Sequence, residues 1–132
     1  MMAVVVVTSD KVYGEGERLP YAEGDRLAGR QPYEASKVCA DVLAQSYARS
    51  FGLPVGIARA GTLYGPGDCQ WRRIVPGTVR SLLRGERPVI RSDGTLVRDY
   101  FFVGDAAGAL IALGGALDRP EVQGEAFNFG TG

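Results

Sequence analysis

The chain has 132 residues, which is enough for one domain and too few for two ordinary ones. Its 45% hydrophobic content excludes a disordered tail, and its formal net charge of zero argues against a general binder of nucleic acid or anionic membranes, because both depend on a basic excess. No apolar run is long enough to cross a bilayer and no signal-peptide pattern precedes the first strand, so we expect a cytoplasmic protein.

The first half of the chain predicts a strand, a helix and a second strand. The run from Ala3 to Val7 is continuous and β-branched, which is typical of a strand buried on both faces of a parallel sheet. Residues 15–30 form a long loop rich in glycine and charge, and such loops are usually functional or mobile. A helix should run from Pro32 to Phe51, before a glycine cap, and residues 54–60 should form the next parallel strand. The helix should bury an apolar stripe made of Ala35, Val38, Cys39, Val42, Leu43 and Tyr47.

The middle of the chain predicts a smaller lobe. A glycine-rich turn over residues 61–67 precedes a helix from Ile74 to Arg84. Residues 89–91 and 95–103 should then pair as strands around an Asp-Gly turn.

The last part of the chain predicts a return to the sheet. Asp105 can cap a helix over residues 106–117, and residues 126–129 should form a closing strand.

Residue types restrict the chemistry. The chain has no histidine, which excludes Ser-His-Asp and Cys-His catalysis and histidine-based zinc sites. Cys39 and Cys69 show no metal-ligand spacing and are typical of a reducing compartment, so we interpret them as packing and loop residues and predict no metal site. Lys11 and Lys37 are the two lysines among 15 basic residues. A bias toward arginine codons explains the ratio, but the two lysines are also candidates for positions that need an ammonium, since arginine cannot lose its proton.

Polar residues after the strands are the candidate site, because ligands of open α/β sheets bind beyond the carboxyl ends of the strands. Ser9, Asp10 and Lys11 follow the first strand, and residues 61–68 follow the second.

A tyrosine and a lysine on the predicted helix add a second candidate. Tyr33 and Lys37 are four residues apart, so their side chains share one helix face. A nearby ammonium favours the phenolate, which makes Tyr33 a plausible general base. Alone the pattern is weak, and a surface pair in which Lys37 bridges to Asp41 is the alternative.

Several segments, taken in chain order, resemble the extended short-chain dehydrogenase/reductase superfamily of nucleotide-sugar epimerases and dehydratases. The resemblance covers essentially the whole chain. The matching segments are Thr8 to Gly14, Tyr33-x-x-x-Lys37, Arg59 to Asp68, Gly94 to Asp105 and Phe127 to Gly130. Within the family, the chain looks closest to CDP-glucose 4,6-dehydratases through Ser9-Asp10-Lys11, Arg73-Ile-Val-Pro76 and the run from Arg87 to Gly94.

The resemblance implies an α/β fold: the carboxyl-terminal half of a doubly wound, Rossmann-type parallel sheet with a small substrate-binding lobe. The family's Gly-x-x-Gly-x-x-Gly turn, which cradles the dinucleotide pyrophosphate, has no counterpart here. The chain therefore resembles the second half of such an enzyme and is expected to be inactive alone. A partial epimerase/dehydratase domain over residues 1–132 would divide into a sheet and catalytic segment (1–68), a substrate-binding lobe (69–104) and a return helix and strand (105–132).

The resemblance also implies a reaction, the 4,6-dehydration of a nucleotide-activated hexose by transient C4 oxidation, loss of water and hydride return. Tyr33 would take the proton of the 4-hydroxyl, Lys37 would hold the nicotinamide ribose, and Ser9 would bind the 4-oxygen. Asp10 would be the acid that protonates the leaving 6-hydroxyl. Lys11 stands where many dehydratases have the glutamate base that deprotonates C5, a role that requires a neutral lysine; a simple ion pair with Asp10 is the alternative.

The remaining expectations concern ligands. Tyr33, Lys37 and the backbone of Arg59 and Ala60 would contact NAD, with a structural ion pair as the alternative for Arg59. NADP stays open, because the residues that select it belong to the other half. A nucleotide sugar is the expected partner, without nucleic acid or membrane, and the complete enzyme should be a homodimer. The candidate substrate-binding residues are Thr62, where many relatives have asparagine, and Arg73 and Arg98, which suit a pyrophosphate or are simply solvated charges.

Two other functions remain open at this point. One is an epimerase or reductase of the same superfamily, in which Asp10 and Lys11 are merely polar. The other is an inactive fragment that only binds a partner chain.

Overall fold

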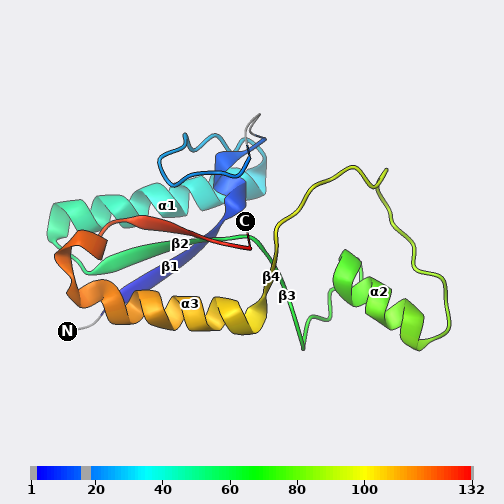
Figure 1. The fold of residues 1–132 in the computed structure, drawn as a ribbon. Coiled ribbons are helices and arrows are strands. Elements are labelled where there is room, and N and C mark those ends of the chain that lie inside the picture. Colours follow the sequence, from blue (N-terminus) through cyan, green and yellow to red (C-terminus); the bar gives the residue numbers. More distant parts are fainter. Residues whose placement is uncertain (1–2, 16–18, 132) are drawn as a thin grey trace.

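A computed structural model describes residues 3–15 and 19–131 (Figure 1). Its main sheet has three parallel strands in the order β1-β2-β5. Strand β1 (Val4–Ser9) pairs with β2 (Val55–Ala60), and β2 pairs with β5 (Ala126–Phe129). These strands agree with the predicted ones to within two residues, which confirms a parallel α/β architecture.

Two helices cover opposite faces of this sheet (Figure 1). Alternate residues of β2 face opposite sides, so Val55 and Ile57 pack with α1 (Pro32–Phe51) while Ala58 packs with α3 (Val103–Gly115). Helix α3 lies so close to the sheet that a Cβ at Gly56 would press against Leu113 and Leu117. The core is therefore two thin apolar layers, one on each side of the central strand.

Helix α1 has the predicted ends. The Glu34 carboxylate accepts hydrogen bonds from the backbone amides of Arg30 and Gln31, and Pro32 occupies the first turn, where no amide hydrogen is needed. Gly52 closes the helix with a φ of 61°, a conformation that favours glycine, and its amide donates to the Ala48 carbonyl.

The predicted buried stripe of α1 is wrong. Its Ala35 and Val38 are half-buried, and the buried residues of the helix are Asp41, Ala44 and Ala48. The other four predicted positions are exposed: Cys39, Val42, Leu43 and Tyr47. Small alanines allow the helix to approach the strands closely, whereas the larger side chains extend past the sheet edge. Leu43 and Tyr47 line a shallow apolar groove there, together with Val4, Val6, Ala40, Ala44, Leu53 and Val55.

Strand β1 forms one edge of the sheet among the described residues. Val4 and Val7 are 40% and 42% exposed, whereas every residue of β2 is buried. The strand is thus confirmed, but burial of both its faces is not.

The lobe differs from the prediction in how its strands pair. A strand pair is present, but it joins β3 (Thr62–Tyr64) to β4 (Tyr100–Phe102) in parallel. The expected hairpin around Asp93-Gly94 is wrong: residues 89–97 are irregular and exposed. An isolated hairpin is only marginally stable in water. No described strand lies beside residues 89–97 that could bury the apolar face of a hairpin there.

Two helices complete the chain. Helix α2 (Ile74–Leu83) matches its prediction and stands apart from the main sheet (Figure 1). Helix α3 begins three residues earlier than predicted, so Asp105 lies in its first turn and is not its cap. The negative charge of Asp105 in the first turn still interacts favourably with the helix dipole and stabilises α3. Short 3₁₀ helices lie at Asp10–Tyr13, Ala116–Asp118 and Pro120–Val122.

Candidate active site

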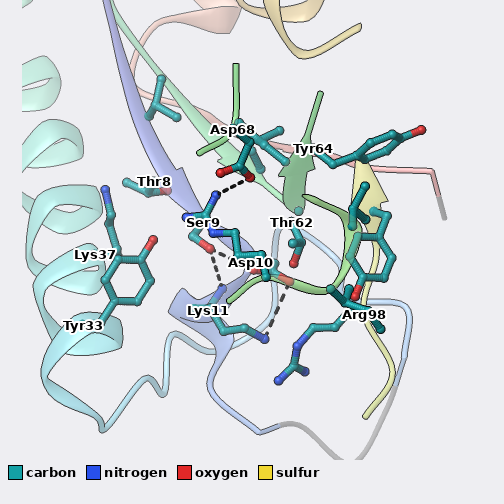
Figure 2. A pocket seen from close by; sticks show the side chains of 18 of the residues that line it. Thr8, Ser9, Asp10, Lys11, Tyr33, Lys37, Thr62, Tyr64, Asp68 and Arg98 are labelled. Carbon is teal, nitrogen blue, oxygen red and sulfur yellow. Dashed lines mark hydrogen bonds and ion pairs between the residues drawn. The ribbon is translucent and has the colours of Figure 1, made fainter. Parts of the chain in front are cut away.

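A pocket of about 540 Å³ opens at the carboxyl ends of β1 and β2 (Figure 2). This is where an open α/β sheet binds its ligands. Nine of the ten residues predicted for the site line this pocket, and Arg59 is the exception. The nine are Ser9, Asp10, Lys11, Tyr33, Lys37, Ala60, Thr62, Arg73 and Arg98.

Tyr33 and Lys37 enter the pocket from the first turns of α1. The Lys37 ammonium lies 5.8 Å from the centre of the Tyr33 ring. Figure 2 shows both side chains beside β1, with the Tyr33 hydroxyl on the side of the pocket where Ser9 lies. Within the described residues, neither side chain forms a hydrogen bond or an ion pair, so both are available to a ligand.

Ser9, Asp10 and Lys11 are linked at the end of β1, where the strand turns into a 3₁₀ helix. The Ser9 hydroxyl donates to Asp10 Oδ1 at 2.8 Å and accepts from the Lys11 amide at 3.3 Å. The Lys11 ammonium lies 3.8 Å from Asp10 Oδ2. The Asp10 carboxylate is therefore held between a hydroxyl and an ammonium, and the ion-pair alternative for Lys11 is present in the structure.

Two arginines lie on the lobe side of the pocket. Arg73 forms an exposed ion pair with Asp68 at 3.2 Å. Arg98 is exposed and donates one hydrogen bond to the Val97 carbonyl at 3.0 Å. Each guanidinium retains donors for a bound anion.

The Arg59 side chain does not reach the pocket. It is 4% exposed and forms a bidentate ion pair with Asp41, at 2.8 Å from Nε and 2.9 Å from Nη2. Burial opposes its charge, but hydrogen bonds with Asp41 and Tyr13 outweigh burial and raise the pKa of Arg59 above its ordinary value. For this side chain the structural ion pair is the alternative that the structure shows; a backbone contact with NAD stays a prediction.

The sequence analysis did not predict the polar network around Arg59. Arg59 Nη1 donates to the Tyr13 hydroxyl and to the Glu23 carbonyl, both at 2.9 Å. The Tyr13 hydroxyl donates in turn to Asn128 Oδ1 at 2.7 Å. The signal was Asp41 itself, which continues the four-residue spacing of Tyr33 and Lys37 and therefore faces the same way.

A second cluster joins the lobe to the main sheet. The Asp99 carbonyl accepts from the Thr62 amide at 2.7 Å, and its carboxylate accepts from Thr131. A Cβ at Gly130 would collide with this carboxylate, so a larger residue there would displace the Asp99 side chain. The lobe side of the pocket is thus fixed to the end of β5.

Other kinds of site find no support in the described residues. Across residues 3–15 and 19–131, no helix combines the length and apolar character needed to cross a membrane. The same residues contain no group of three or more metal-ligating side chains placed to hold an ion.

A parallel sheet with helices on both faces, and a Tyr-x-x-x-Lys pair in a pocket at its carboxyl ends, is the arrangement of a Rossmann-type short-chain dehydrogenase/reductase. A family model described as "NAD dependent epimerase/dehydratase family" matches residues 1–130. The chain belongs to this family.

Characterised relatives include sugar-nucleotide dehydratases and epimerases. dTDP-glucose 4,6-dehydratase of Streptomyces antibioticus is 38% identical over 129 residues, which cover 97% of this chain and 37% of that protein. The solved dTDP-glucose 4,6-dehydratase of Bacillus anthracis, in complex with NAD, superposes with a TM-score of 0.85 at 32% identity, over 97% of this chain and 40% of that one. A UDP-N-acetylglucosamine 4-epimerase of Methanobrevibacter ruminantium gives 0.81 at 28% identity, with coverages of 97% and 41%. The chain therefore spans less than half the length of these relatives.

Proposed function

We propose that this chain is the catalytic and substrate-binding half of an NAD-dependent nucleotide-sugar 4,6-dehydratase. The observation that carries the proposal is the presence of Tyr33 and Lys37 in one pocket with Ser9 and Asp10. The division into a sheet and catalytic segment (1–68), a lobe (69–104) and a return helix and strand (105–132) is part of the proposal. The complete enzyme would be this chain preceded by the dinucleotide-binding half that its relatives have.

The pocket residues fit the nicotinamide-ribose end of NAD. The Lys37 ammonium and the Tyr33 hydroxyl line the pocket without hydrogen-bond or ion-pair partners among the described residues, as donors for ribose hydroxyls should. Ala60 adds backbone at the end of β2. The pyrophosphate cradle must come from the other half, because no Gly-x-x-Gly-x-x-Gly turn occurs in this chain. When bound, NAD would accept a hydride from the sugar and later return it.

Tyr33 would begin the reaction by removing the proton of the sugar 4-hydroxyl. The adjacent Lys37 ammonium would stabilise the phenolate electrostatically, and the Ser9 hydroxyl would turn its one donor from Asp10 to the sugar 4-oxygen. The resulting ketone would acidify the hydrogen at C5.

Asp10 would then act as the acid that protonates the leaving 6-hydroxyl. Proton removal from C5 and departure of the 6-hydroxyl give water and a C5–C6 double bond, and hydride return to C6 with a proton to C5 completes the 4-keto-6-deoxy sugar. In the free pocket the Asp10 carboxylate accepts from the Ser9 hydroxyl and pairs with Lys11, so Asp10 would have to take up a proton before it acts as the acid. Lys11 could serve as the C5 base only after it releases Asp10 and loses its proton.

The lobe would hold the nucleotide. Arg73 and Arg98 are proposed to bind the pyrophosphate, with Thr62 near the sugar, because guanidinium groups give fixed bidentate donors to phosphate. The CDP-glucose type remains our choice of nucleotide because of Ser9-Asp10-Lys11 and the run from Arg87 to Gly94. Cys39 and Cys69 are free, which supports a cytoplasmic enzyme, and a homodimer is proposed for the complete protein.

Product analysis tests this proposal. The complete enzyme is incubated with NAD and with CDP-glucose, dTDP-glucose or UDP-glucose, and the products are identified by NMR. We expect a 4-keto-6-deoxy sugar, formed fastest from CDP-glucose. A C4 epimer without loss of water would support the second candidate, an epimerase, which the structural likeness to a 4-epimerase favours. Conversion of none of these sugars would contradict both.

The 132-residue chain alone is proposed to be inactive. Titration of the purified chain with NAD in a calorimeter should give no useful binding, because the helix N-terminus and glycine turn that neutralise the pyrophosphate are not part of it. Micromolar binding to a monomer would contradict this part of the proposal.

A further inference from the structure

Asp41 lies one helical turn after Lys37, at the spacing at which a lysine and an aspartate on a helix form an ion pair. Such a pair would draw the Lys37 ammonium away from Tyr33. The structure shows no such pair: within the described residues, the ion-pair partner of Asp41 is Arg59 from the central strand β2.

The Asp41 carboxylate has no capacity left for another donor. Its Oδ1 accepts from Arg59 Nη2 at 2.9 Å and from Gln45 Nε2 at 2.7 Å. Its Oδ2 accepts from Arg59 Nε at 2.8 Å and from the Thr8 hydroxyl at 3.4 Å. A carboxylate offers about four acceptor positions; three N–H donors occupy three of them, and the Thr8 hydroxyl, which lies at 3.4 Å from both Asp41 and the Ala58 carbonyl, stands at the fourth.

Other contacts hold the Arg59 guanidinium in the position from which it donates to Asp41. Its Nη1 donates to Tyr13 and to the Glu23 carbonyl, and its guanidinium carbon lies 5.2 Å from the Tyr13 ring centre. Asp41 is 0% exposed, so water cannot replace Arg59 without a change in the packing. A buried carboxylate that loses its cation either takes up a proton or pairs with another cation, and the nearest lysine along its own helix is Lys37.

We propose that Arg59 is a positioning residue that occupies the Asp41 carboxylate and so keeps the Lys37 ammonium free for Tyr33 and the cofactor ribose. The role of Lys37 in this inference rests on the proposed function. The identity of the cation that pairs with Asp41 does not depend on the reaction.

Two substitutions that break the same buried pair separate this role from a purely structural one. Arg59→Gln leaves a carboxylate with open acceptor positions beside Lys37. Asp41→Asn leaves no carboxylate with which Lys37 could form an ion pair. Both should lower the melting temperature of the complete enzyme, since each leaves one buried partner unsatisfied. Only Arg59→Gln should also weaken NAD binding, by about tenfold, because a hydrogen bond from a charged donor is withdrawn.

The measurements are the calorimetric Kd for NAD and crystal structures of both variants. We expect Asp41→Asn to bind NAD nearly as tightly as the unmodified enzyme, and Arg59→Gln to show the Lys37 ammonium paired with Asp41. Arg59→Lys retains a cation and should keep the affinity, which preserves the test if Arg59→Gln fails to fold. Parallel loss of affinity in Arg59→Gln and Asp41→Asn, or a Lys37 that stays beside Tyr33 in Arg59→Gln, would overturn the proposal. If the unmodified enzyme does not bind NAD, the proposed function fails, and the position of Lys37 in the variant structures still decides this inference.

Discussion

The Asp99 carboxylate accepts hydrogen bonds from both the backbone amide and the hydroxyl of Thr131, at 3.0 and 2.6 Å from its Oδ1. Asp99 directly follows Arg98 in the lobe, and Thr131 follows the last strand of the main sheet. This contact joins the segment that carries Arg98 to the end of β5. The position of Arg98 relative to the rest of the pocket therefore depends on Asp99.

Asp99→Ala should weaken substrate binding more than it slows the chemistry. Loss of hydrogen bonds to a charged acceptor costs about 1.5–3 kcal/mol, and here that loss would release the lobe wall. We expect a KM for the nucleotide sugar raised by about tenfold or more with a smaller change in kcat. Asp93→Ala, which removes an exposed aspartate of the same lobe bonded to Thr95, is the control and should leave KM unchanged. A change confined to kcat would contradict this role for Asp99.

Tyr33→Phe in the complete enzyme should abolish oxidation at C4. The substitution removes the hydroxyl that would take the proton of the sugar 4-hydroxyl and leaves the ring in place. We expect no reduced nicotinamide absorbance in a single turnover, while NAD still binds through Lys37. Tyr64→Phe removes a hydroxyl from the lobe side of the same pocket and is the matched control. Equal activity of Tyr33→Phe and the unmodified enzyme would remove Tyr33 from the mechanism.

Asp10→Asn should spare C4 oxidation and slow the loss of water. An amide of the same shape cannot protonate the leaving 6-hydroxyl, and removal of a positioned acid costs on the order of a hundredfold in rate or more. Solvent deuterium entering at C5, followed by NMR, reports deprotonation separately from elimination. If oxidation and elimination slow by the same factor, the division of labour between Asp10 and Tyr33 is wrong.

Strand positions and helix ends could be predicted from the sequence because local signals determine them, and the place of the pocket follows from the carboxyl ends of those strands. Pro32 and Gly52 mark the ends of α1 by their own backbone requirements, and the run from Val4 to Val7 suits a strand. The inward face of α1 could not be predicted, since Leu43 and Tyr47 satisfy a helical apolar period equally well whether or not the sheet extends beneath them. Its polar contact to the sheet is equally non-local: Arg59 lies 18 residues after Asp41.

The strand pairing of the lobe and the ion pair of Arg59 also depend on contacts between residues far apart in the sequence. The segment from Val89 to Val97 has residues typical of strands, but a strand also needs a neighbouring strand to pair with. The strand β4, which the prediction had paired with this segment, pairs with β3. For the site, the structure brings nine of the ten predicted residues to one pocket. The sequence could not decide the place of the Arg59 side chain, because the predicted NAD contact uses only the backbone and the ion pair depends on Asp41, 18 residues away.

Glu34→Gln should make the protein less stable at neutral pH and leave acid stability unchanged. Backbone hydrogen bonds from Gln31 and Arg30 hold the pKa of the Glu34 carboxyl below its usual value of 4.5. A group with a lowered folded-state pKa stabilises the fold above its unfolded pKa, and that contribution is lost as the pH falls through the folded value. The melting temperatures of Glu34→Gln and the unmodified protein should therefore differ at pH 7 and converge in acid. A difference that persists below the folded pKa would show that the carboxylate charge is not what stabilises the start of α1.

Val4→Lys should reduce self-association of the 132-residue chain. Within the described residues, β1 pairs with β2 along one side, and Val4 and Val7 lie at the other, partly exposed edge of the sheet. An unpaired, β-branched edge is a template for another strand, and a charged side chain on such an edge opposes further pairing. Light scattering of the chain at increasing concentration should show weaker association for Val4→Lys. Ile111→Lys adds the same charge at an exposed site of α3, on a face of the sheet instead of its edge, and is the control. If Ile111→Lys reduces association as much as Val4→Lys does, added charge in general explains the effect and the edge of β1 is not the surface through which copies meet.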